Sequence, residues 1–207
     1  DSIFYAAMYE SIQRTGTWQG EIWNRRKNGE IHPNWLTITV VKNADGTIAN
    51  HIAMLTDITE RKAAEDQLRK LSLAVEQSPE SVVITDLDGK IEYVNEAFVQ
   101  NSGYSREETI GHNPRVLKSG NTPLETYASL WHTLKQGLSW KGELHNRRKD
   151  GSFYVEFAVI SPISQPDGRI THYVAVKEDI SEKTRMGEEL DRHRKNLKKL
   201  VEDRTSE

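Results

Sequence analysis

Apolar and polar residues alternate along much of this chain, which is the pattern of half-buried β-strands. In residues 81–98, SVVITDLDGKIEYVNEAF, two short apolar runs flank Asp88-Gly89, a dipeptide that favours the tight turn of a hairpin. Three further strand-like runs cover residues 139–148, 152–163 and 170–177. Because Asp150-Gly151 and Pro166-Asp167-Gly168 separate these runs as turn signals, we expect an antiparallel meander.

Helical spacing replaces this alternation between the two groups of strands. Ser105, followed three residues later by Glu108, is a capping-box signature for a short helix that Gly111 can end. Thr122 suits the N-cap, and Pro123 the first turn, of a longer helix that stops before the meander. This order of elements predicts an α+β fold with a five-stranded antiparallel sheet and helices on one face.

One segment of the chain occurs twice, as a tandem repeat. WQGEIWNRRKNG begins at Trp18 and returns 122 residues later as WKGELHNRRKDG from Trp140, and DITE at 57–60 returns as DISE at 179–182 with the same offset. The first copy starts where the second is already within its long helix, so the first copy lacks the front half. We therefore expect the C-terminal half of a first domain at 1–59, a helical linker at 60–77, a complete domain at 78–182 and a C-terminal helix at 183–207.

Positions at alternating steps of four and three predict coiled-coil character in both charged helices. In the linker they are Leu68, Leu71 and Val75, and in the C-terminal helix they are Met186, Leu190, His193, Leu197, Leu200 and Arg204. The expected arrangement is a parallel homodimer that transmits a twist or register change through these helices. An ordinary solvated helix is the alternative.

Composition limits the classes of function. Hydrophobic residues make up 36% of the chain, charged residues 29%, and the net charge is -3, so we expect a cytoplasmic, soluble region without a nucleic-acid partner. No apolar run approaches the roughly 20 residues that cross a bilayer. The chain has no cysteine, and its seven histidines have no zinc or iron spacing. Because nucleophile–base pairs and phosphate loops are also missing, we expect a regulatory region and not an enzyme.

Several segments are similar to one protein family. VEQSPESVVITDLDGKIEYVNEAFVQNSGY, IGHNPRVLKSGNTP, the NRRKDG turn and HYVAVKEDISEK resemble the PAS family of sensory domains and its C-terminal motif. The resemblance covers 78–183 completely and 1–61 as a C-terminal half. LKSGNTP, SLW and WKGELHNRRKDG are most similar to the flavin-binding PAS domains of redox and energy sensors, the kind found in nitrogen-fixation regulators, aerotaxis receptors and methane-oxidation sensors.

This resemblance implies FAD as the cofactor. Asn146 takes the position at which flavin-binding PAS domains bond the pyrimidine edge of the ring, and Trp131 takes the position of their pocket tryptophan. Trp140 lies six residues before Asn146 on the same strand, so alternation places both on one face. Asn113 is the asparagine of the G-x-N motif of these domains.

Two positions depart from the flavin-binding pattern. Pro114 stands where those domains have an acidic residue and Val83 where they have a pocket serine, so that side of the ring would face apolar groups. Pro114 also occupies the position of the reactive cysteine of light-sensing LOV domains, which excludes their cysteinyl photochemistry. Heme ranks below flavin because His132 of the long helix does not align with the axial histidine of heme-binding members.

Each candidate residue also has a structural interpretation. Trp131 and Trp140 are typical of a core, and Asn146, which recurs as Asn24, is typical of a hydrogen-bonded core amide. The rival function is therefore a dimerisation and relay module whose pocket is filled by its own side chains or by a small ligand. The Arg-Arg-Lys runs at 25–27 and 147–149 are expected to be solvated hairpin flanks, with phosphate binding as the alternative. In either case we expect the output domain, beyond Glu207, to be a histidine kinase or, alternatively, a diguanylate cyclase.

Overall fold

The computed structural model describes residues 2–205, and the side chains of residues 3–198. The chain divides into two compact units, Asp1–Leu71 and Ser72–Glu207. Each unit contains one antiparallel sheet, of three strands in the first unit and five in the second.

The first unit is a three-stranded meander with one helix packed on it. Its elements are α1 (Ser2–Thr15), β1 (Thr17–Arg25), β2 (Ile31–Lys42) and β3 (Ile48–Asp57), followed by α2 (Thr59–Glu76). Met8 and Ile12 of α1 are buried against the sheet. Every residue of β3 is exposed, and within the described residues this strand pairs only with β2.

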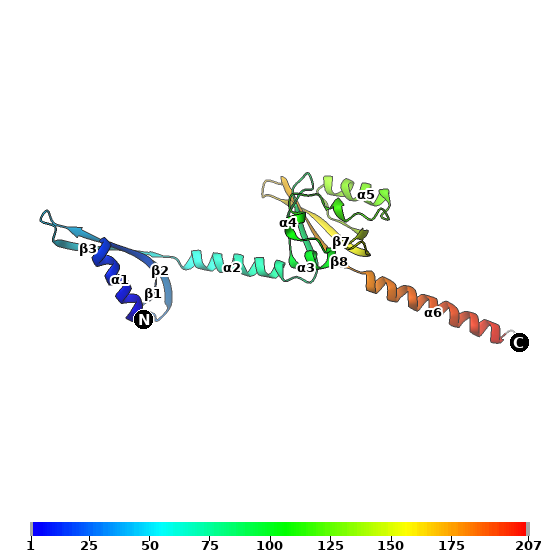
Figure 1. Cartoon of the computed structure of the whole chain (residues 1–207), viewed down its shortest axis with the longest axis horizontal. Helices are drawn as coiled ribbons and strands as arrows, with labels where there is room; N and C mark the ends of the chain where they lie inside the picture. Colours follow the sequence, from blue (N-terminus) through cyan, green and yellow to red (C-terminus); the bar gives the residue numbers. More distant parts are fainter. Residues whose placement is uncertain (1, 206–207) are drawn as a thin grey trace. The chain divides into compact units, whose positions relative to one another are not determined.

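The second unit holds a five-stranded sheet in the order β5-β4-β8-β7-β6, which confirms the predicted fold class (Figure 1). Its strands are β4 (Ser81–Thr85), β5 (Ile91–Val94), β6 (Trp140–Arg147), β7 (Phe153–Ser164) and β8 (Ile170–Asp179). The chain crosses between β5 and β6 through α3 (Glu96–Ser102), α4 (Arg106–Thr109), the 3-10 helix η1 (Pro114–Leu117) and α5 (Leu124–Lys135). The chain then continues into α6 (Ser181–Thr205).

The two units repeat the same arrangement of strands. β2 and β7 begin and end 122 residues apart, and so do β3 and β8. Asn34 lies opposite Asp57 in the first sheet, and Glu156 lies opposite Asp179 in the second. The first unit therefore contains the counterparts of α5, β6, β7, β8 and the start of α6, as the sequence repeat predicts.

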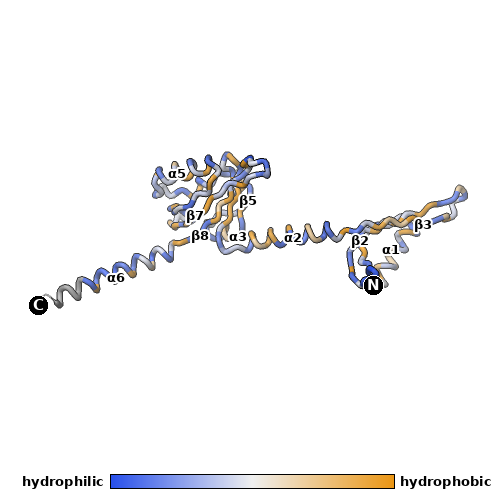
Figure 2. Tube along the Cα trace, turned by 180° about the vertical axis from the view of Figure 1, so that it is seen from behind, coloured by the Kyte–Doolittle hydropathy of each residue, from blue (hydrophilic) through white to orange (hydrophobic). Residues whose placement is uncertain are grey.

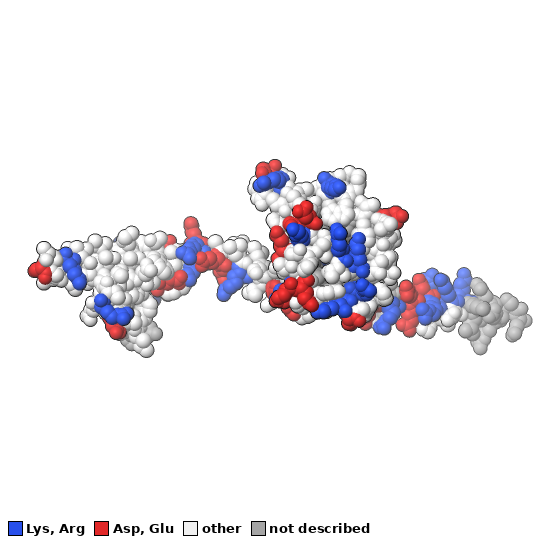
Figure 3. All heavy atoms as spheres, turned by 45° about the horizontal axis from the view of Figure 1, so that its top comes forward, with Lys and Arg blue, Asp and Glu red and all other residues white. Residues whose placement is uncertain are grey.

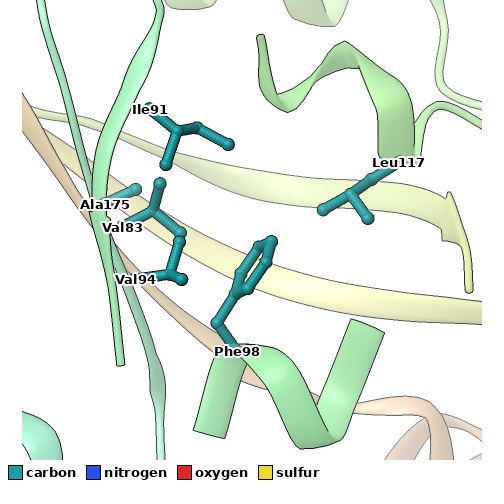
Figure 4. Close-up of a cluster of buried hydrophobic side chains, with 6 residues drawn as sticks. All are labelled: Val83, Ile91, Val94, Phe98, Leu117 and Ala175. Carbon is teal, nitrogen blue, oxygen red and sulfur yellow. The ribbon is translucent and has the colours of Figure 1, made fainter. Parts of the chain in front are cut away.

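One face of the five-stranded sheet carries the core of the second unit. One cluster joins α3 and η1 to the strands, and its members point toward one another in Figure 4: Val83, Ile91, Val94, Phe98, Leu117 and Ala175. The other joins α5 to the same face and comprises Leu130, Leu134, Trp140, Leu144 and Ala158. Ile160 packs against both clusters. Figure 2 shows the strands of this sheet as largely hydrophobic and α6 as largely hydrophilic.

The predicted capping box is confirmed, but the predicted N-cap of the long helix is wrong. Ser105 and Glu108 cap each other's backbone at the start of α4, which is a single turn. α5 has Pro123 at its N-cap and no side-chain cap. The hydroxyl of Thr122 instead accepts a hydrogen bond from the backbone N–H of His145 at 2.8 Å. The threonine therefore fixes the loop before α5 to β6 and leaves the helix uncapped.

The described residues of α6 are mostly charged or polar, with a few exposed apolar side chains between them. Met186, Leu190 and Leu197 are exposed, and Figure 3 shows basic and acidic side chains interspersed along α2 and α6 on the face in view. Leu200 and Arg204, the last two positions of the predicted seam, lie outside the described side chains. Among the described helices, none is long and apolar enough to span a membrane.

Candidate functional site

A cavity of about 140 Å³ lies between the inner face of the five-stranded sheet and α5. One ordered water needs about 10–15 Å³ of such space, so the cavity has room for a ring system and is much larger than a single-ion site. Its lining comprises Val83, Thr85, Gly89, Asn113, Pro114, Arg115, Lys118, Tyr127, Leu130, Trp131, Leu134, Leu144, Asn146, Ile160, Tyr173, Ala175 and Lys177.

The structure brings five of the six residues predicted as cofactor-binding to this cavity: Val83, Asn113, Pro114, Trp131 and Asn146. The sixth, Trp140, lies on the same sheet face but does not line the cavity. Its side chain is 6% exposed and packs in the core beneath α5. Its indole covers Gly142, where an added Cβ would come within 2.4 Å of the ring. Trp140 therefore supports the α5 side of the cavity from behind.

Asn146 is the buried amide of the cavity. It is 4% exposed and lies opposite Tyr154 in the β6–β7 ladder. Burial and the charge of Glu156 raise the pKa of Tyr154 above its usual range, and a hydrogen bond with Asn146 opposes that shift. Lys118 forms a backbone bridge with Asn146, which holds the loop after η1 across this end of the sheet.

An aromatic wall closes the side of the cavity near α5. Trp131 of α5 meets Tyr173 of β8 edge to face, with ring centroids 6.1 Å apart. Trp131 is 39% exposed, so its indole reaches both the cavity and solvent. The turn after β4 also borders the cavity, because Gly89 has φ +78° and a Cβ there would come within 2.7 Å of the Asn113 amide. A side chain at Gly89 would therefore collide with the cavity lining.

The floor of the cavity contains a buried ion pair that the sequence reasoning missed. Lys177 Nζ lies 2.7 Å from Glu156 Oε1, and the two side chains are 6% and 4% exposed. Lys177 lines the cavity, and Glu156 lies behind it on β7. Comparing the two copies at the offset of 122 residues could have found the pair, because the first copy has Asn34 and Leu55 at these positions.

The junction between the sheet and α6 is held by side chains. Arg148 Nη2 donates to Asp179 Oδ2 at 2.6 Å, and its Nη1 donates to the carbonyl of Asn101 at 2.7 Å. Asp179 Oδ1 accepts the backbone N–H of Ser181, whose hydroxyl accepts the backbone N–H of Val155. The first turn of α6 is thereby fixed to β7 and β8.

The first copy repeats this junction. Arg26 donates to Asp57, and Thr59 donates to Asp57 from both its hydroxyl and its backbone N–H. The Thr59 hydrogen bonds, with a smaller effect from Arg26, lower the pKa of Asp57 to about 2. Arg26 is exposed, as the prediction of solvated flanks expects, although it pairs with Asp57. Arg148 is half-buried, so the prediction is wrong for Arg148.

Polar groups near the start of β4 fix the end of α2. Asn95 is fully buried, and its amide donates to the carbonyl of Val75 at 3.1 Å. The carboxylate of Glu76 accepts hydrogen bonds from the Tyr93 hydroxyl and from Arg106. Burial and Glu76 raise the pKa of Tyr93 to about 12. Both flanking helices are thus attached to the domain by buried or half-buried polar groups.

A sequence model of the PAS domain matches residues 1–60 and 79–182, which together exceed half of the chain. The chain therefore belongs to the PAS domain family, whose members are sensory domains. This match includes the five-stranded sheet, the cavity and the α6 junction of the second unit, and the three-stranded sheet of the first.

Two characterised relatives are regulatory or sensory proteins. The nitrogen fixation regulatory protein of Klebsiella oxytoca is 41% identical over 107 residues, which cover 52% of this chain and 22% of that protein. The aerotaxis receptor of Escherichia coli is 36% identical over 93 residues, which cover 45% of this chain and 18% of the receptor. The chain thus spans about a fifth of the length of these relatives.

A solved structure shows the same fold. The PAS domain of a protein from Colwellia psychrerythraea aligns with a TM-score of 0.52 and 24% identity, covering 56% of this chain and 99% of that domain. At this identity the similarity concerns the fold alone.

Proposed function

We propose that the complete PAS domain binds FAD in the cavity and senses redox state or oxygen. The observation that carries this proposal is the buried Asn146 amide at the edge of a cavity with aromatic and aliphatic walls. A flavin ring is flat and largely apolar with one polar edge, so it needs such walls together with a side chain that both donates and accepts hydrogen bonds. The similarity of the sequence to flavin-binding PAS domains points to the same cofactor.

The lining fits a flavin in a specific way. Trp131 and Tyr173 offer aromatic surface, and Asn146 can bond the pyrimidine edge. Bound flavin would supply the electron-transfer chemistry, and the groups around it would tune that chemistry. Val83 and Pro114 make their part of the wall apolar, so polar signalling contacts would come from other lining residues, such as Asn146 and Lys177 of the sheet.

The proposed output route runs through β7 and β8 to α6. Glu156 lies directly opposite Asp179 in the ladder, and Asp179 holds the first turn of α6. A rearrangement of the cavity floor would therefore reach the base of the helix across one pair of residues. We propose that the chain forms a homodimer and that α6 passes the signal to a downstream histidine kinase, with a diguanylate cyclase as the alternative output.

A second candidate is a cofactor-free or small-ligand module that dimerises and relays signals. The exposed Met186, Leu190 and Leu197 of α6 favour this function because they offer an apolar stripe to a partner helix. The apolar Val83 and Pro114 favour it as well, since they remove two polar groups from the pocket.

The absorption spectrum of the purified protein, with chromatography of any released chromophore, tests the first proposal. We expect flavin bands that dithionite bleaches, and FAD as the released compound. Asn146→Leu should lower FAD affinity by about 10- to 100-fold, because it removes hydrogen bonds to the ring worth about 1.5–3 kcal/mol. Asn24→Leu changes the equivalent strand position of the first copy and should leave binding unchanged. A protein that takes up no FAD on incubation would favour the relay module.

A further inference from the structure

The Glu156–Lys177 pair differs from every other ion pair in the described part of the chain. Both of its side chains are less than a tenth exposed, whereas every other pair has side chains at least 24% exposed. Desolvating an ammonium and a carboxylate is costly, and an apolar pair of similar size often stabilises a fold as well or better. A buried pair beside a cavity therefore needs a reason other than stability.

The first copy shows that the three corresponding strands pair without this ion pair. Asn34 and Leu55 occupy the equivalent positions of β2 and β3, in the same register relative to Asp57 as Glu156 has to Asp179. The charges thus occur in the copy that contains the cavity, and an amide and an aliphatic side chain replace them in the first copy, of which this chain contains the C-terminal half. The pair accompanies the site and not the strand arrangement.

The contacts of the pair are incomplete. Although Lys177 Nζ lies 2.7 Å from Glu156 Oε1, that oxygen has no well-aligned hydrogen-bond donor. Lys177 borders the cavity, and its strand neighbours are Ala158 of β7 on one side and Ser81 of β4 on the other. An ammonium has three donors, so Lys177 can turn hydrogen bonds toward a ligand while it stays within reach of the carboxylate.

We propose that this pair sets the charge state of the bound flavin, with Lys177 stabilising negative charge on the ring and Glu156 limiting that effect. The inference rests on the proposed function. If the oxidised ring took two electrons from a reductant such as dithionite and one proton from solvent, it would gain one negative charge. A cation at the floor of a buried cavity acts through a low dielectric, so Lys177 favours the reduced form and raises the midpoint potential, whereas Glu156 lowers it.

The test is a redox titration of the FAD-loaded chain and two single variants. Lys177→Met should lower the affinity for reduced relative to oxidised flavin about tenfold, which corresponds to a midpoint about 30 mV lower for two electrons. Glu156→Gln leaves the ammonium unopposed and should move the midpoint in the opposite direction. Midpoint shifts of opposite sign in the two variants indicate a charge effect. A loss of packing would not change the direction of the shift according to which charge is removed.

Lys141→Met is the matched control. Lys141 is an exposed lysine of β6 that does not line the cavity, so solvent screens its charge and the midpoint should change little. If a single variant fails to fold, Lys177→Met combined with Glu156→Gln buries no lone charge. This double variant should lower the midpoint, but by less than the roughly 30 mV expected for Lys177→Met. The midpoint still falls because Lys177 is the member of the pair that borders the cavity.

The outcomes separate the two proposals. A wild-type chain that binds no flavin overturns the proposed function and this inference with it. Flavin bound at an unchanged midpoint in both single variants, or shifted in the same direction by both, overturns the inference alone. A midpoint of the double variant at or above the wild-type value likewise overturns the inference alone.

Discussion

Replacing Arg148 by methionine should weaken the attachment of α6 to the sheet. The guanidinium donates to Asp179 at 2.6 Å and to the Asn101 carbonyl at 2.7 Å, and it lies over the Tyr154 ring at 4.3 Å from the ring centroid. Asp179 in turn accepts the Ser181 N–H at the start of α6. One substitution therefore removes the group that orients the carboxylate capping the helix.

The magnitude follows from the burial of these contacts. Exposed ion pairs contribute about 0–1 kcal/mol, and breaking a buried pair costs about 3–5 kcal/mol. The side chains of Arg148 and Asp179 are 25% and 24% exposed, between these two cases, so their ion pair should contribute about 1–2 kcal/mol. The hydrogen bond to Asn101 adds about 1 kcal/mol, and the contact with Tyr154 about 0.5–1 kcal/mol. We expect a loss of about 3 kcal/mol in the free energy of unfolding of the second unit.

Hydrogen exchange measured by mass spectrometry locates the effect. The amides of Val155 and Ser181, which bond across the junction, should exchange on the order of 100-fold faster in Arg148→Met. Arg147→Met removes the same charge from the exposed neighbouring residue and should cost less than about 0.5 kcal/mol. If the two variants lose the same stability and protection, the ion pair does not hold α6.

Two further predictions concern the tryptophans and the junction of the first copy. Trp140→Ala should cost about 3–5 kcal/mol of stability in urea titrations because Trp140 is a core residue. Trp131→Ala should lower FAD affinity about tenfold but cost less than about 1.5 kcal/mol of stability, since the Trp131 side chain is 39% exposed. The reverse result would contradict the placement of the two tryptophans. Asp57 has a pKa of about 2 against 3.8 in the unfolded chain, so its ionised form contributes stability above about pH 4 that is lost as the pH falls toward 2. Thr59→Ala should raise the Asp57 pKa in an NMR titration, and an unchanged pKa would show that the Thr59 hydrogen bonds do not cause the shift.

Most of the fold could be predicted from local signals. The Asp88-Gly89 and Asp150-Gly151 turns lie where the structure has hairpins, and the Ser105–Glu108 capping box forms as its spacing predicts. These features depend on backbone preferences within a few residues, so the sequence is sufficient to locate them. The N-cap of α5 was mispredicted because Thr122 bonds to His145, a residue distant in the chain.

The candidate site was only partly predictable. Strand alternation correctly placed Trp140 and Asn146 on one face of β6, yet only Asn146 reaches the cavity. Alternation gives the face of a residue but not what covers it, and Trp140 lies beneath α5 in the core. Lys177 and Glu156 were not recognised because a lysine and a glutamate in separate strands carry no local sign of being buried together.

The sequence by itself determined the repeat, the order of strands and helices, and the family, because these follow from periodicity, turn residues and similar segments along one chain. The tertiary structure decided which inward-facing side chains border the cavity, that Arg148 joins the sheet to α6, and that Glu156 and Lys177 share a buried contact. These outcomes depend on the register between strands and on how α5 and η1 cover the sheet. Such relations bring together residues far apart in sequence, and no local pattern encodes them.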